Sequence, residues 1–207
     1  MPAAGAGPQR LLGAPQAGVQ PLLRGLFLVL FLEILGASLT IPVFYYFCIH
    51  ELGLSAAEVG TAMACFNAAQ FVGAPVIGRI SDARGRRRVL LGVFFWTSLC
   101  FAATCFVHSF EELLVVRALA GLSGGSIVVS TAMIMDASTS AERPQQLGVL
   151  GGILGVAFTI GPGLVTLALY LREVDRRWVF ASASALAFGG ACVGCCILQE
   201  TLGPDRR

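Results

Sequence analysis

Charged side chains are scarce in this sequence. Only 13% of its 207 residues are Asp, Glu, Lys or Arg, whereas 56% are hydrophobic, and the mean hydropathy is +0.79. A soluble domain of this length carries nearly twice that charged fraction. The composition therefore excludes an ordinary soluble domain and predicts a membrane protein with several spans. At about 20 apolar residues for each spanning helix, with short turns, the chain has room for about six.

Lysine is absent, because all 14 basic residues are arginine. Five of these arginines form one turn without interleaved aromatic residues, a pattern that gives no indication of a nucleic-acid partner. A Ser/His/Asp set, an HExxH motif and a phosphate-binding loop are missing, so we expect no enzyme activity, no cofactor and no metal site. The seven cysteines all lie in apolar runs. We interpret them as small apolar packing residues rather than as ligands or disulfides.

Six apolar runs are predicted to be transmembrane helices, which makes the fold class an all-α membrane protein. They cover residues 24–47, 56–77, 89–107, 112–135, 147–171 and 178–198. Residues 1–23 are rich in Ala, Gly, Pro and Gln and are predicted to be a disordered cytoplasmic tail. Residues 199–207 are expected to be a second tail or the start of a central loop. Most arginines fall on the side of the amino terminus, so the positive-inside rule places both termini in the cytoplasm.

The densest charge lies between the second and third runs. Residues 70–90 read Q-F-V-G-A-P-V-I-G-R-I-S-D-A-R-G-R-R-R-V-L. This pattern predicts that an apolar helix ends near Gly78, that a basic turn follows, and that the next helix begins near Val89. Gly78 is expected to permit a close helix contact, and Gly85 a left-handed turn that reverses the chain.

The stretch G-R-I-S-D-A-R-G-R-R at residues 78–87 resembles the loop signature of the major facilitator superfamily, G-x-[LI]-[AS]-D-R-x-G-R-[RK]. One position departs from it, because Ala83 stands where an arginine is usual. The preceding Q-F-V-G-A-P-V-I-G resembles the drug and tetracycline:proton antiporter branch and its animal relatives. The resemblance covers residues 24–202 approximately. It implies one six-helix half of the family's fold and proton-coupled transport of a small organic solute, with antiport favoured over symport.

A cytoplasmic gate is predicted beside the basic turn. Asp82 and Asp136 end two predicted helices on the same face, so we expect both carboxylates within ion-pair reach of Arg86. The family's loop motif implies such a relay. The gate motif comprises Gly78, Asp82, Gly85, Arg86, Arg87 and Asp136.

Two charges, Glu33 and Arg117, lie deep in predicted helices. Each costs about 2.5–3.5 kcal/mol at a helix centre, so neither should face lipid. They are interpreted as a protonatable carboxylate beside a fixed cation, or alternatively as a structural pair that locks the first and fourth helices. The resemblance favours the first interpretation. Antiporters of this branch have an acid at the place of Glu33, and the R-x-x-x-G from Arg117 to Gly121 resembles their motif for proton coupling.

Weaker candidates are found in the second and fifth runs. Asn67 and Gln70 lie three residues apart, so they share a helix face and are expected either to line the cavity or to bond to another helix. Gly155, Gly161 and Pro162 resemble the helix-five antiporter motif, although the second glycine pair of that motif is absent.

Two functions of different class follow. The first is a transporter of protons and a small solute in the lipid bilayer. The second is a non-transporting six-helix fragment or assembly partner of a full-length transporter. We expect the polar face to be covered by a second six-helix half or by a second copy, and favour the former because the chain ends where a family transporter's central loop begins. The plasma membrane and the endomembranes both stay open, as does the solute.

Overall fold

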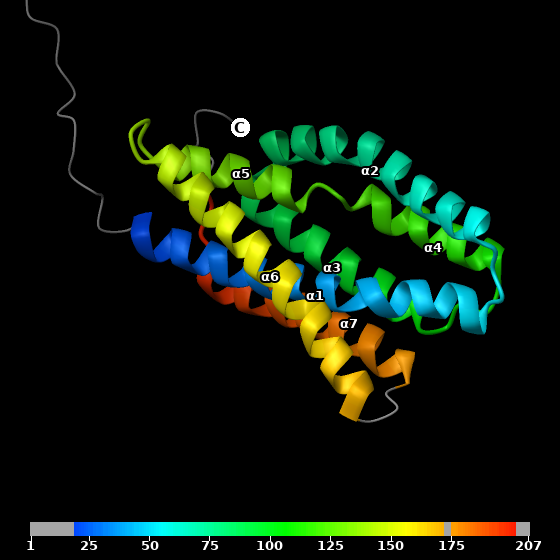
Figure 1. Cartoon of the computed structure of the whole chain (residues 1–207). Helices are drawn as coiled ribbons and strands as arrows, with labels where there is room; N and C mark the ends of the chain where they lie inside the picture. Colours follow the sequence, from blue (N-terminus) through cyan, green and yellow to red (C-terminus); the bar gives the residue numbers. More distant parts are fainter. Residues whose placement is uncertain (1–18, 172–174, 202–207) are drawn as a thin grey trace, which may run out of the picture.

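A computed structural model describes residues 19–171 and 175–201, and these residues form helices only. The helices are α1 (Val19–Tyr46), η1 (Phe47–Glu51), α2 (Ala56–Arg84), α3 (Arg86–Thr104), α4 (Phe110–Leu122), α5 (Ser126–Ala137), α6 (Arg143–Leu171) and α7 (Arg176–Ile197). Six stretches are long and apolar enough to span a membrane, because η1 continues α1, and α4 and α5 together form one stretch (Figure 1). The all-α fold with six spans is confirmed. The cytoplasmic position of the termini stays a prediction.

The boundary between α2 and α3 differs from the prediction. The turn expected between Gly78 and Val89 is helical except at Gly85, since α2 continues to Arg84 and α3 begins at Arg86. Arginine is a good helix former, so the charge alone does not end a helix. Gly85 breaks the helix because its φ of 102° is a conformation that side chains disfavour. The role predicted for Gly85 is confirmed, and the helix end near Gly78 is wrong.

Other helix ends also shift. α1 begins at Val19, inside the predicted tail, and the rest of that tail lies outside the described residues, as do residues 202–207. The expected helix over 112–135 is divided into α4 and α5 at residues 123–125. Gly124 and Gly125 weaken the helix there. A Cβ at either would meet a side chain of α2, so close packing accompanies the break.

Small residues let the helices approach one another. α1 packs mainly against α6 and α7, α2 against α4, and α3 against α7. Gly73 of α2 faces the backbone of Leu122, and Gly121 of α4 faces the backbone of Phe66, so the α2–α4 contact is nearly backbone to backbone. In a bilayer such close packing replaces the hydrophobic effect as the source of helix association.

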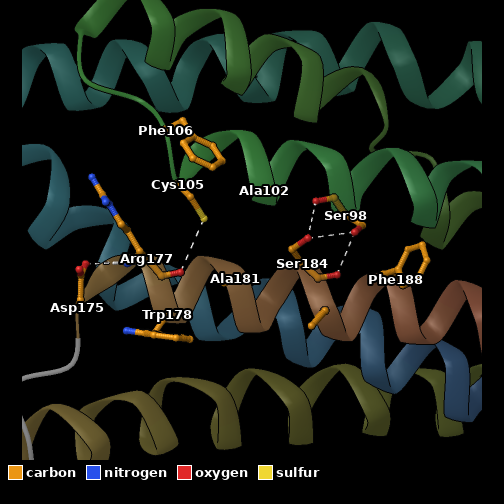
Figure 2. Close-up of a pocket in the computed structure, with 11 residues that line it drawn as sticks. Ser98, Ala102, Cys105, Phe106, Asp175, Arg177, Trp178, Ala181, Ser184 and Phe188 are labelled. Carbon is orange, nitrogen blue, oxygen red and sulfur yellow. Dashed lines mark hydrogen bonds between the residues drawn. The ribbon is translucent and has the colours of Figure 1, made fainter.

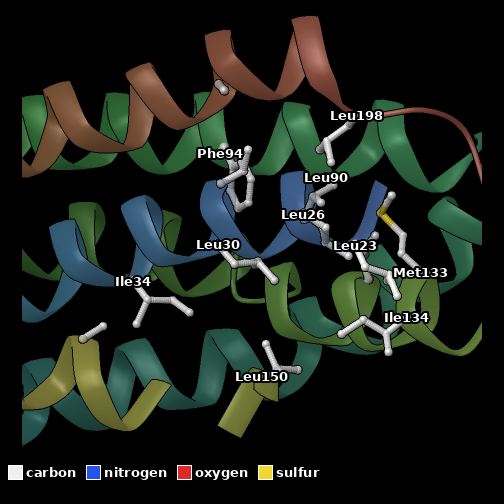
Figure 3. Close-up of a cluster of buried hydrophobic side chains, with 14 residues drawn as sticks. Leu23, Leu26, Leu30, Ile34, Leu90, Phe94, Met133, Ile134, Leu150 and Leu198 are labelled. Carbon is white, nitrogen blue, oxygen red and sulfur yellow. The ribbon is translucent and has the colours of Figure 1, made fainter. Parts of the chain in front are cut away.

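Two clusters of buried apolar side chains lie toward opposite ends of the bundle. The first lies toward the end that carries Arg84 and Arg86, called the basic end below, and joins Leu26 and Leu30 of α1 to Phe94 of α3 (Figure 3). The second includes Phe44, Phe47, Leu113 and Phe180. Along α1, the residues between these clusters line the cavity described next.

Candidate functional site

A cavity of about 330 Å³ lies between the two apolar clusters and opens on one face, where the lining residues Ile41 and Phe158 are about half exposed. Most of its wall is apolar, with Phe66, Phe101 and Phe158 among the lining residues. The polar side chains on the wall are Glu33, Thr40, Gln70, Thr97, Arg117, Ser123 and Ser126. These come from α1, α2, α3, α4 and α5, so nearly the whole bundle contributes. A largely apolar wall with a few convergent polar groups is typical of a small-molecule site.

Glu33 is the acidic residue of the cavity. Its side chain comes from the middle of α1 and is 7% exposed. Within the described residues, no hydrogen bond or ion pair reaches its carboxylate. The prediction that Glu33 faces the bundle interior, in company with side chains of the second and fourth spans, is confirmed by its neighbours Gln70 and Arg117 on the cavity wall.

Arg117 stacks on an aromatic ring. Its guanidinium carbon lies 3.7 Å from the centroid of the Phe44 ring, and its Nε is buried with no hydrogen-bond partner. Cation–π contact with a ring favours a cation in a desolvated place. Within residues 19–171 and 175–201, no ion pair reaches the Arg117 guanidinium. Glu33 and Arg117 therefore share the cavity in this conformation without forming the structural pair that was the alternative interpretation.

Only one of the two polar residues expected on α2 lines the cavity. Gln70 does so and packs against Gly124 at the break between α4 and α5. Asn67 is exposed and is not among the residues that line this cavity, so its role at the site stays a prediction. Residues Met63, Phe66 and Gln70 form the inward face of α2. A three-residue step leaves side chains about 60° apart on a helix of 3.6 residues per turn, which places Asn67 beyond the edge of that face.

The predicted gate contacts are present at the basic end. Arg86 Nη1 lies 2.9 Å from Asp82 Oδ1, and Arg86 Nε contacts Asp136 Oδ2 at the end of α5. The Asp136 side chain is 17% exposed and that of Asp82 62%. Both predicted pairings are confirmed. Gly78 lies nearby but has ordinary space, because an added Cβ would be 3.6 Å from Val128, so the close helix contact expected there is wrong.

Two further contacts tie α7 and the segment after it to this gate, and both were missed by sequence reasoning. The Glu200 carboxylate accepts a hydrogen bond of 2.9 Å from the backbone N–H of Arg86. Arg87 Nη2 donates to the carbonyl oxygen of Cys195 at 2.6 Å. A carboxylate at a helix amino end accepts its free N–H groups and opposes the helix dipole. The available signal was Glu200 itself, an acid directly after the last apolar run.

The residues of the helix-five antiporter motif lie in α6, and of its two glycines only Gly161 lies at a contact with another helix. A Cβ at Gly161 would overlap Ser38 of α1, whose Oγ donates to the Ala157 carbonyl of α6 at 2.8 Å. Gly161 therefore permits the close approach of α1 and α6. Gly155 faces open space, and Pro162 lies inside α6 without interrupting it.

Comparison with known proteins supports the fold. A family model described as Major Facilitator Superfamily matches residues 26–206. The chain is 34% identical over 183 residues to multidrug resistance protein 1 of Bacillus subtilis (strain 168), covering 86% of this chain and 44% of that protein. It is 30% identical over 165 residues to quinolone resistance protein NorA of Staphylococcus aureus (strain MRSA252), covering 78% and 41%. The chain thus spans less than half the length of these curated relatives.

Solved structures with the same arrangement include two transporters. The human organic anion transporter MFSD10 (TETRAN) superposes with a TM-score of 0.77 at 24% identity, over 93% of this chain and 50% of that chain. The proton:xylose symporter XylE gives 0.63 at 16% identity, over 89% and 46%. At these identities the likeness supports the fold alone.

Proposed function

The chain belongs to the major facilitator superfamily, a family of multi-pass membrane transporters rather than enzymes, and on this premise we propose that it forms a six-helix half of a proton-coupled transporter for a small organic solute. Antiport is the proposed direction of coupling. Glu33 is the proposed proton carrier, Arg117 the fixed cation beside it, and the contacts around Arg86 the gate at the basic end.

The buried Glu33 carboxyl, without a partner in the cavity, is the observation on which this proposal rests. An ionised acid inside the bilayer costs several kcal/mol unless it is paired or hydrated. Binding a proton removes that cost, and so does binding a solute that donates hydrogen bonds or carries positive charge. Competition between the two at one carboxylate is the physical basis of proton-for-solute exchange.

The names of the two bacterial relatives support the choice of solute class. Both refer to resistance, one to several drugs and one to quinolones. The apolar wall and the aromatic side chains Phe66, Phe101 and Phe158 favour a solute with an apolar body. A quinolone is accordingly the first probe to use.

Glu33→Gln tests the proposed proton carrier, because Gln keeps the shape of the side chain and loses its charge. In proteoliposomes that contain a pH-sensitive dye, we expect quinolone-driven proton movement with the wild-type protein and none with Glu33→Gln. Glu111→Gln, at an exposed residue of the first turn of α4, is the matched control and should behave as wild type. Unchanged proton movement in Glu33→Gln would remove Glu33 from the mechanism.

The second candidate function is that of a non-transporting assembly partner. It is favoured by one observation, that the chain spans 41–50% of the proteins it matches. Alternating access needs two bodies that rock about a shared site, so we propose that one six-helix unit does not transport alone. A second half or a second copy would cover the cavity face. Solute-dependent proton flux through a cross-linked, demonstrably monomeric preparation would refute this.

A further inference from the structure

A second hollow lies on the outside of the bundle, away from the Glu33 cavity. It is a groove of about 750 Å³ between α3 and α7, at the end opposite the basic end (Figure 2). Its floor and walls include Ala102, Ala181 and Ala185. At its rim, Phe106 is 74% and Trp178 is 73% exposed. The mechanism proposed above makes no use of it.

The groove has the depth of one bilayer leaflet. Along α7 it extends from Trp178 to Phe188, which is about 15 Å at 1.5 Å per residue. The hydrocarbon core of a bilayer is about 30 Å thick, so the groove reaches from one membrane surface to the midplane. Both α3 and α7 are long and apolar enough to span a membrane, so a groove on the outer side of this helix pair would face lipid hydrocarbon.

The polar groups in the groove bond to each other. Ser98 Oγ donates to the Ser184 carbonyl at 3.0 Å, and Ser184 Oγ donates to the Ser98 carbonyl at 2.9 Å, as Figure 2 shows. The Cys105 thiol contacts the carbonyl oxygens of Phe101 and Arg177. Because these groups are hydrogen-bonded within the protein, an apolar chain that lies on the floor of the groove covers few unsatisfied polar groups.

The outer end of the groove is suited to a phosphate. Arg177 and Trp178 lie there, and α7 begins at the same place. A guanidinium attracts a phosphate, and Trp is enriched at the membrane–water interface. Asp175 is the opposing charge at this end. Its carboxylate accepts a hydrogen bond of 3.0 Å from the backbone N–H of Arg177. No ion pair reaches the Arg177 guanidinium within residues 19–171 and 175–201.

We propose that this groove binds one phospholipid, with an acyl chain between α3 and α7 and the phosphate at Arg177. The leaflet depth, the opening to hydrocarbon and the cation at the interfacial end all match this one occupant. The binding is independent of solute transport, since the groove shares no residue with the Glu33 cavity.

Photo-crosslinking in nanodiscs tests the proposal. The full chain is placed in phosphatidylcholine nanodiscs with a tracer phosphatidylglycerol that carries a diazirine at the middle of one acyl chain, and the adducts are mapped by mass spectrometry. We expect adducts concentrated at Ala102, Ala181 and Ala185. Ala181→Phe should fill the groove and abolish them. Leu99→Phe, on the exposed side of α3 but outside the groove, should leave them unchanged.

The phosphate contact is tested separately by comparing this tracer with a diacylglycerol that bears the same diazirine chain. The wild-type protein should favour the phospholipid, and Arg177→Gln should reduce that preference by about fivefold, the ratio that corresponds to about 1 kcal/mol for an ion pair near the surface. Arg177→Lys should retain part of it. Adducts spread evenly over α2, α3 and α6, or unaffected by Ala181→Phe, would overturn the proposal.

Discussion

Gly73→Ala is the sharpest test of the backbone contact between α2 and α4. A Cβ at Gly73 would lie 2.8 Å from Leu122 Cα and 2.9 Å from the Leu122 carbonyl carbon, and still closer to the carbonyl oxygen. Ordinary contacts begin at 3.4 Å, and backbone atoms cannot rotate away, so the two helices must separate by several tenths of an ångström. Overpacking of this kind costs about 1–3 kcal/mol, which lowers the Tm of a chain this size by about 2–12 °C.

Gly60→Ala supplies the matched control, because it makes the same change in the same helix at a place where nothing lies within 4 Å of the new Cβ. Alanine is a better helix former than glycine by up to about 1 kcal/mol, so Gly60→Ala should leave the Tm unchanged or raise it. The measurement is thermal unfolding of both variants in the same detergent, followed by circular dichroism. Equal Tm values for the two variants would show that α2 and α4 do not pack as closely as described.

The two ion pairs of Arg86 should differ in strength, because the Asp136 side chain is 17% exposed and that of Asp82 62%. Asp136→Asn should therefore lower the Tm more than Asp82→Asn, and salt at about 1 M should remove the effect of Asp82→Asn first; the reverse order would contradict the geometry. Before α6, the side-chain and backbone hydrogen bonds from Thr139 lower the pKa of the Glu142 carboxyl. That stabilisation is present above the ordinary pKa of a glutamate and is lost as the pH falls through the lowered one. Thr139→Ala should raise the Glu142 pKa in an NMR titration, and an unchanged value would refute the contact.

The features that could be predicted from the sequence were those that depend on a short stretch of residues. A charge inside an apolar run is costly wherever it lies, so Glu33 and Arg117 could be assigned to the interior before any packing was known. The pairings of Arg86 followed from helix ends that emerge on one face. The number of spans followed from the lengths of the apolar runs, which depend little on how the helices pack.

Features that depend on the packing of distant segments could not be predicted in this way. The stack of Arg117 on Phe44 requires the relative height and rotation of α4 and α1, which neither sequence segment determines alone. The exposure of Asn67 depends on which face of α2 meets α4, and two polar residues near each other did not decide that face. The break at Gly124 is likewise understandable only beside Gln70 of α2.

The bond from Glu200 to the amide of Arg86 also determines an order of assembly. The two residues are separated by 114 positions, so during synthesis the amino end of α3 is made long before its carboxylate partner exists. Through the insertion of α4 to α7, the first N–H groups of α3 must be satisfied by water at the membrane surface. Completion of the last span then replaces that water, so this bond at the basic end forms only after α7 has been made.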